Sequence, residues 1–232
     1  MPAAIAPHYN YHYNPLQAAQ AMQAVKRVQV QALKTTAVQT VQGSTVTTQD
    51  KESEALALLA TLSFAGLGLV EKATVKVLNL FARRLFANSR TGGLVLLCAV
   101  VYVHRFIAKC GSVKTTQGIE FRLLAVALML AFKMCEDNVL VRSAEWVHVC
   151  GSLHLDVKML QAMERELLIA IDYDVLLKGD ELKLLVSSLA TLVHANHRSS
   201  STDSVGSVAA SRLALEILNQ ISANHLDLAM DS

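Results

Sequence analysis

Two side chains of opposite charge interrupt apolar helical patterns and are the residues best suited to contact another molecule. Lys133 lies in the last turn of the apolar segment 121–135, and Glu136 and Asp137 follow that segment directly. Glu164 lies in the middle of a later segment. A lysine at the end of an apolar helix either extends to the surface or meets a partner. The position of Lys133 has a second explanation, in which the lysine complements the helix C-terminus and the acids that follow are solvated.

The sequence contains no arrangement of residues typical of an enzyme. It has no glycine-rich phosphate loop, no G-x-S-x-G motif and no H-E-x-x-H motif. His194 and His197 lie three residues apart, but the further ligands of a metal site are missing, so we expect two solvated histidines. His104 and His148 fall within apolar segments, where we expect partly buried histidines with satisfied hydrogen bonds. We therefore predict a non-catalytic protein without a metal ion or cofactor.

The cysteine pattern excludes two further classes of site. Cys98, Cys110, Cys135 and Cys150 are never closer than twelve positions and form no C-x-x-C motif, which argues against zinc ribbons and dithiol redox motifs. We expect them to be small, buried apolar residues. The first residues lack the basic and apolar regions of a signal peptide, so we expect a location in the cytoplasm or nucleus.

The net charge of the chain is too small to create a strong electrostatic field. Lys and Arg total 21 and Asp and Glu total 19, which leaves a net charge of +2 at pH 7, too little to attract nucleic acid or anionic lipid strongly. The longest strongly apolar run without charge, residues 55–70, falls short of the roughly 20 residues that span a bilayer. We expect neither nucleic-acid binding nor membrane insertion.

The elements that must position these residues are helices. Hydrophobic residues make up 53% of the chain and charged residues 17%, so the chain must bury a large surface. All three prolines lie within the first fifteen residues, and a core without proline suits helices better than strands. We predict an all-α fold. Its expected parts are a Gln/Ala/Thr-rich tail that is disordered or partly helical (1–52), a helical domain with a preceding helix (53–180), an extra helix (181–195), a Ser-rich linker (196–211) and a short amphipathic C-terminal helix (212–232).

Apolar periodicity predicts five helices within the domain, over residues 70–87, 94–108, 121–135, 143–149 and a segment that Asp156 caps. The segment 121–135 is apolar on every face except at Arg122 and Lys133, so we expect it to be the central helix. Trp146 is expected to anchor the short fourth helix in the core.

The order of these segments resembles the cyclin box, and in particular the single-box cyclins of the fungal Pcl, or phosphate-response, type. The resemblance rests on VVYVHRFI (100–107), FRLLAVALMLAFKMCEDN (121–138) and LDVKMLQAMERELLIAIDYDVLL (155–177), with Trp146 between the last two. Met159 and Gln161 depart from the residues usual in the family. The fifty-odd residues after 177 are too few for a second five-helix box.

The resemblance implies a regulatory subunit that binds and activates a cyclin-dependent protein kinase and helps to select its substrates, in cell-cycle or nutrient signalling. The kinase-contacting lysine and glutamate of the family fall on Lys133 and Glu164, and Asp137 would add an acid for a kinase arginine. Both Lys133 and Glu164 are expected to be exposed in the unbound box. ATP and magnesium would belong to the kinase, and no small-molecule ligand is implied.

Two other classes of protein compete with this interpretation. A helical adaptor or membrane-surface protein with a cyclin-like fold and no kinase partner is suggested by the apolar run 55–70 and the Gln-rich tail. An all-helical enzyme would need a convergent polar pocket, which the sequence does not reveal.

Overall fold

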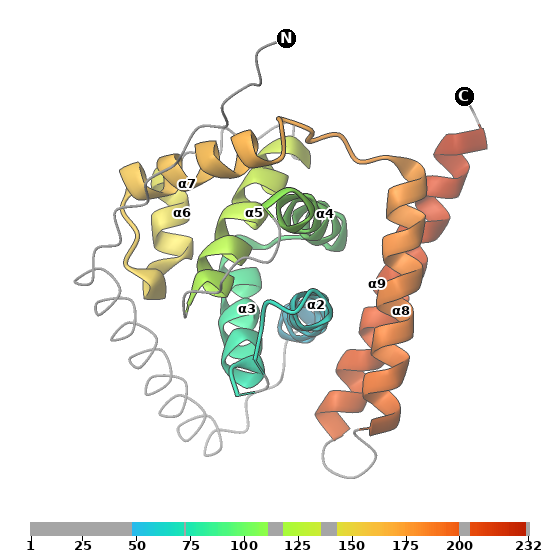
Figure 1. The fold of residues 1–232 in the computed structure, drawn as a ribbon. Coiled ribbons are helices and arrows are strands. Elements are labelled where there is room, and N and C mark those ends of the chain that lie inside the picture. Colours follow the sequence, from blue (N-terminus) through green and yellow to red (C-terminus); the bar gives the residue numbers. More distant parts are fainter. Residues whose placement is uncertain (1–47, 72, 111–117, 136–142, 200–204, 231–232) are drawn as a thin grey trace, which may run out of the picture.

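The computed structural model describes residues 48–71, 73–110, 118–135, 143–199 and 205–230. These residues form eight α-helices, one short 3-10 helix and no strand (Figure 1). The helices are α2 (Thr48–Gly66), α3 (Val75–Ser89), α4 (Gly93–Cys110), α5 (Ile119–Cys135), α6 (Ser143–Val149), α7 (Val157–Ala170), α8 (Gly179–Ser199) and α9 (Val205–Met230), with the 3-10 helix η1 (Gly151–Leu153) before α7. The predicted all-α class is confirmed.

Helices α3 to α7 form a box around α5, as the sequence predicted. Residues 123–131 of α5 are all buried, because this stretch contains no polar side chain and must be covered on every side. Helices α3, α4 and α7 pack against it (Figure 1). The ring of Phe81 on α3 meets the ring of Phe121 on α5 edge to face, with 5.3 Å between their centroids. The five helices expected over 70–171 are all present, and α6 has the predicted bounds.

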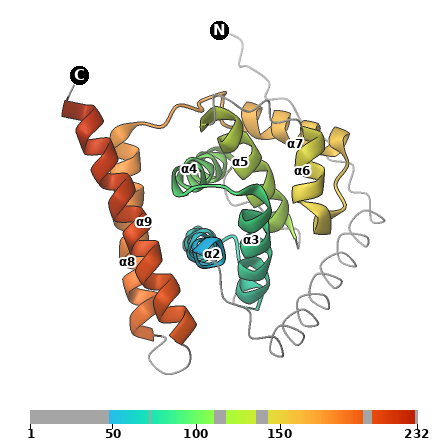
Figure 2. The same ribbon diagram turned by 180° about the vertical axis from the view of Figure 1, so that it is seen from behind.

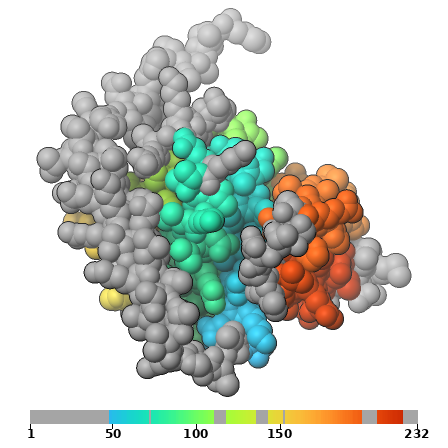
Figure 3. Space-filling view, turned by 90° about the horizontal axis from the view of Figure 1, so that it is seen from below, coloured from blue at the N-terminus to red at the C-terminus, as the bar shows by residue number. Residues whose placement is uncertain are grey.

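Helix α2 forms a second buried centre next to the box. It lies between α3 and α4 on one side and the antiparallel pair α8 and α9 on the other (Figures 1 and 2). Its side chains from Ala55 to Ala57 are almost fully buried. The hydroxyls of Thr61 and Ser63 are buried as well, and each donates a hydrogen bond to the carbonyl four residues earlier, at 2.7 Å. Seen from below, α2 (blue) lies between α3 and the orange to red α8–α9 pair (Figure 3).

The predicted linker over 196–211 is wrong at both ends. Helix α8 continues to Ser199, and α9 already begins at Val205, so the C-terminal helix is longer than predicted. The reason is tertiary burial, since Ala210, Ser211 and Ala214 of α9 are buried in a helix that packs against α2 and α8. Such burial outweighs the weak helix propensity of serine. Helix α2 likewise begins at Thr48, inside the predicted tail, and residues 1–47 lie outside the described part of the chain.

The apolar run 55–70 lies largely in α2 and is mostly buried within the protein. Among the described residues, α4 alone is long and apolar enough to cross a membrane, and half of that 18-residue window is buried inside the protein. The core helix of a helical domain has the same character. The burial of α4 against α5 therefore accounts for its composition.

Candidate functional site

Lys133 and Glu164 meet in the structure as an ion pair between two helices. The Lys133 Nζ donates to both carboxylate oxygens of Glu164, at 2.7 Å to Oε1 and 2.8 Å to Oε2. The lysine comes from the last turn of α5 and the glutamate from the middle of α7. The structure thus joins two residues that the sequence selected separately. Asp137, the third predicted contact residue, lies outside the described residues.

The expectation that both side chains are exposed in the unbound protein is wrong. Only 25% of the Lys133 side chain and 16% of the Glu164 side chain are exposed to solvent. Each group compensates the charge of the other, which allows both to leave bulk water. The spacing of residues on α7 indicates that Glu164 faces inward. Glu164 follows Leu160 by four positions and precedes Leu167 by three, and both leucines are buried. Glu164 therefore shares the inward stripe of α7.

Aromatic packing and a helix cap hold the two helices in place. Trp146 of α6 is 3% exposed, which confirms its predicted place in the core. Its ring meets Phe132, the residue before Lys133, edge to face at a centroid distance of 5.9 Å. At the start of α7, the Asp156 side chain accepts a hydrogen bond from the Met159 backbone N–H at 2.7 Å, which confirms the predicted cap. These contacts hold the helices that carry Lys133 and Glu164 in position.

The pair keeps hydrogen-bonding capacity toward a partner. An ammonium group has three donors and a carboxylate has about four acceptor positions, so the Lys133–Glu164 contact leaves one N–H and several lone pairs unused by it. Met134, directly after Lys133, is 46% exposed, and Ile169, farther along α7, is 43% exposed. Of these two side chains, Met134 is next to the pair in the sequence, so an exposed apolar side chain adjoins a shielded polar contact there.

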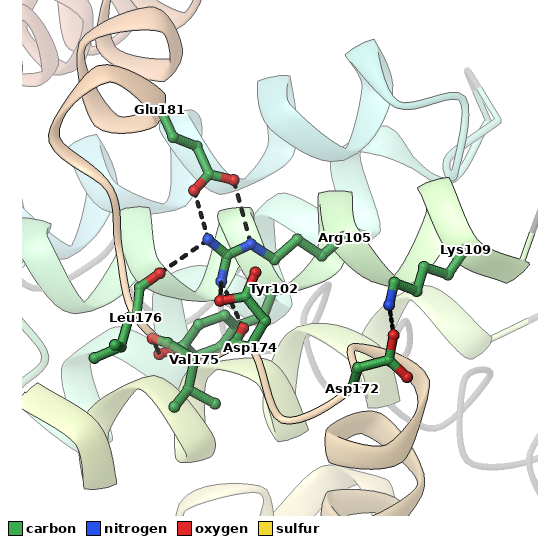
Figure 4. A network of polar contacts seen from close by, with 8 residues as sticks. All are labelled: Tyr102, Arg105, Lys109, Asp172, Asp174, Val175, Leu176 and Glu181. Carbon is green, nitrogen blue, oxygen red and sulfur yellow. Dashed lines mark hydrogen bonds and ion pairs between the residues drawn. The ribbon is translucent and has the colours of Figure 1, made fainter.

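A second polar network joins α4 to the connector, the segment 171–178 between α7 and α8 (Figure 4). Arg105 donates to the Asp174 carbonyl at 2.5 Å and to the Leu176 carbonyl at 2.9 Å. Its guanidinium also binds the Glu181 carboxylate of α8, at 2.5 Å through Nη2 and 3.3 Å through Nε. The Tyr102 hydroxyl donates to the Val175 carbonyl at 2.8 Å. We call these groups the connector network.

The connector network fixes a turn with unusual backbone geometry. Asp172 and Tyr173 have φ angles of 54° and 57°, and a non-glycine residue in this left-handed region costs free energy. Lys109 of α4 forms an ion pair with Asp172. Burial raises the pKa of the Tyr102 hydroxyl, so this group remains a donor. The sequence analysis missed this network, although Tyr102 and Arg105 lie one helical turn apart in the quoted motif.

Within the described residues no three His, Cys, Asp or Glu side chains gather as metal ligands. His194 and His197 are exposed on α8, as predicted. His104 and His148 are exposed rather than partly buried, because they lie on the outer faces of α4 and α6.

The cysteines differ from the prediction in part. Cys98 and Cys150 are buried, whereas Cys110 is exposed at the end of α4 and Cys135 is partly exposed at the end of α5. The two departures share a cause, since both residues end a helix at the edge of the core.

The comparison with protein families agrees with the geometry. Residues 77–176 match the family model of the cyclin N-terminal domain. This segment runs from α3 to the connector, and so contains the five-helix box, Lys133, Glu164 and most of the connector network. No curated protein and no solved structure matched the chain significantly. Over residues 77–176, the chain is therefore similar to the N-terminal domain of cyclins.

Proposed function

We propose that the protein is the regulatory subunit of a cyclin-dependent protein kinase and that the Lys133–Glu164 pair is the centre of its kinase-binding surface. The observation that carries the proposal is the position of this pair. It joins two helices of the segment that matches the cyclin domain, with most of both side chains shielded from solvent and with spare hydrogen-bonding groups.

The physical role of such a subunit is to shift the population of kinase conformations. A regulator activates its kinase by binding the active conformation more tightly than the inactive one. Reversing a 1:99 ratio of active to inactive kinase to 99:1 requires a difference in binding free energy of about 5.5 kcal/mol. A rigid surface serves this purpose well, because little of the binding energy is spent on ordering the regulator. Catalysis, ATP and magnesium then belong to the kinase.

The proposal extends to a finer class. The three sequence motifs resemble the single-box cyclins of the fungal phosphate-response type, and the proposed role is in cell-cycle or nutrient signalling, with a location in the cytoplasm or nucleus. The described residues after the connector form α8 and α9, which pack as a hairpin on α2. Asp137 and the selection of kinase substrates remain part of this proposal.

The competing membrane-surface interpretation loses one of the observations that motivated it, the apolar run, while most of the Gln-rich tail lies outside the described residues. The apolar run 55–70 lies for the most part in the interior, between the box and the α8–α9 hairpin. An adaptor without a kinase partner is the interpretation that remains if no kinase binds.

Affinity capture from the cells of origin tests the proposal. The tagged protein is compared with the double variant Lys133→Ala, Glu164→Ala, and captured proteins are identified by mass spectrometry. The control is the double variant Arg212→Ala, Glu216→Ala. It removes a different ion pair, between an arginine and a glutamate on α9 outside the matched segment, and it also leaves the net charge unchanged. Circular dichroism of each variant confirms that it is folded.

We expect a cyclin-dependent kinase in stoichiometric amount with the wild type and the control, and at least a tenfold weaker association with the Lys133, Glu164 double variant, since loss of a hot spot costs about 2 kcal/mol or more. Equal capture by all three proteins would refute the role of the pair. The absence of a kinase from all three would refute the function.

A further inference from the structure

Two thiols that the proposed function does not use lie within reach of each other in the core. The Sγ of Cys98 on α4 and the Sγ of Cys135 at the end of α5 are 3.5 Å apart. Cys98 is 5% exposed, and Cys135 is partly exposed at the end of its helix. The other cysteines have no such arrangement among the contacts described, because Cys110 is exposed at the end of α4 and Cys150 is buried after α6.

We propose that Cys98 and Cys135 are a reversible modification site, at which a hydroperoxide converts the two thiols into an intramolecular disulfide. Cys135 reacts first, because it is the more exposed of the two. Its thiolate attacks the peroxide, the O–O bond breaks, and Cys135 becomes a sulfenic acid while the peroxide is reduced to water or an alcohol. The Cys98 sulfur then attacks the Cys135 sulfur and the S–O bond breaks, which forms the disulfide and releases water.

The electrostatic surroundings favour this order of events. The pKa of the Cys98 thiol is raised, first by its hydrogen bond with Cys135, then by burial and by the charge of Cys135. Cys98 is therefore protonated and unreactive while Cys135 is reduced. Oxidation of Cys135 to a neutral sulfenic acid removes both of its contributions, and the charge of Arg105, which acts to lower the pKa of Cys98, remains. Cys98 is thus easier to deprotonate once its neighbour has been oxidised, although burial still raises its pKa.

The local structure permits the bond. A disulfide has a sulfur–sulfur distance of about 2.05 Å, so the sulfurs must approach by roughly 1.5 Å. Cys135 is the last residue of α5, where a shift of the backbone disturbs few helical hydrogen bonds. Cys98 lies in the first half of α4, between buried residues on both sides. We therefore expect the last turn of α5 to take up most of this movement.

This last turn also carries Lys133, so the disulfide would displace one partner of the ion pair with Glu164. That consequence rests on the proposed function. Formation of the disulfide does not, and it is measured without a kinase.

The experiment treats the reduced full chain with limiting hydrogen peroxide, blocks the remaining thiols with iodoacetamide and maps all four cysteines by mass spectrometry. We expect a peptide pair linked through Cys98 and Cys135, an intact mass lower by about 2 Da when it is measured before alkylation, and full reversal by dithiothreitol. Cys150 should remain reduced. A Cys110→Ser variant, which lacks the exposed competing thiol, should form the same link to the same extent.

A Cys135→Ser variant should keep Cys98 reduced at the same peroxide dose, and circular dichroism checks that this variant is folded. The mapping of the wild-type chain decides the question even if a variant fails to fold. Recovery of Cys135 as a sulfinic acid beside an unmodified Cys98 would overturn the proposal. Dimers linked through Cys110, with Cys98 and Cys135 both still reduced, would overturn it as well.

Discussion

Replacement of Arg105 by methionine should loosen the connector between α7 and α8. The Arg105 side chain is 11% exposed and makes four hydrogen bonds, to the carbonyls of Asp174 and Leu176 and to both carboxylate oxygens of Glu181. Methionine keeps the apolar part of the side chain and removes all four donors. The variant therefore tests the polar contacts with little change in packing.

The magnitude follows from the burial of the partners. A hydrogen bond to a charged group contributes about 1.5–3 kcal/mol when it is shielded from water. Here Asp174 and Glu181 keep 47% and 31% of their side chains exposed and can be hydrated once the arginine is gone, which reduces each contribution. We expect the whole replacement to lower the free energy of unfolding by about 2–3 kcal/mol. For a chain of this length that corresponds to a melting temperature roughly 5–10 °C lower.

Two assays measure this effect. Urea denaturation followed by circular dichroism gives the change in unfolding free energy. Limited digestion with chymotrypsin gives the local effect, since Tyr173 and Leu176 in the connector are exposed side chains of the kind that this protease cleaves after. Arg105→Lys should recover only part of the stability, because an ammonium group cannot reproduce the planar fork of a guanidinium. A methionine variant with unchanged stability and unchanged cleavage would refute the structural role of the connector network.

Four further substitutions test the core. Gly93→Ala should cost about 1–3 kcal/mol of stability, since a Cβ there would lie 2.5 Å from Cγ2 of Ile217 on α9. Gly92→Ala should be neutral, because nothing lies within 4 Å of the Cβ that it adds. The urea midpoints of the two variants test this difference. Trp146→Ala should cost about 3–5 kcal/mol in the same assay, because the ring is 3% exposed. Burial raises the pKa of Glu120 in the folded protein, so its stabilising contribution is present below the unfolded pKa near 4.5 and is lost as the pH rises through the folded value. Glu120→Gln should therefore gain stability relative to the wild type as the pH rises above the unfolded pKa near 4.5, and equal pH profiles would contradict this reasoning.

The box was predictable because its signals are local. The apolar stretch of α5, the Asp156 cap and the short helix with Trp146 are each recorded within a few residues of sequence, and the structure contains all of them. The candidate pair was also accessible, since Lys133 interrupts an apolar helix and Glu164 follows the inward spacing of α7.

The wrong prediction of a linker at the Ser-rich segment has a non-local cause. Local composition indicated a linker, but α8 and α9 are stabilised by packing against α2, a helix more than a hundred residues earlier in the chain. Helix propensity is weak compared with such burial. Packing against α2 therefore outweighs the local composition in deciding where α8 ends and α9 begins.

The sequence by itself determined the all-helical class, the central helix and the residues that carry the resemblance to the cyclin box, because periodicity and capping act between close neighbours along the chain. Only the tertiary structure decided which side chains meet. The Arg105 contacts join residues 69 to 76 positions apart, the Cys98 and Cys135 sulfurs come together across 37 positions, and Lys133 finds Glu164 across 31. Such contacts depend on how the helices pack, and packing is a property of the whole core.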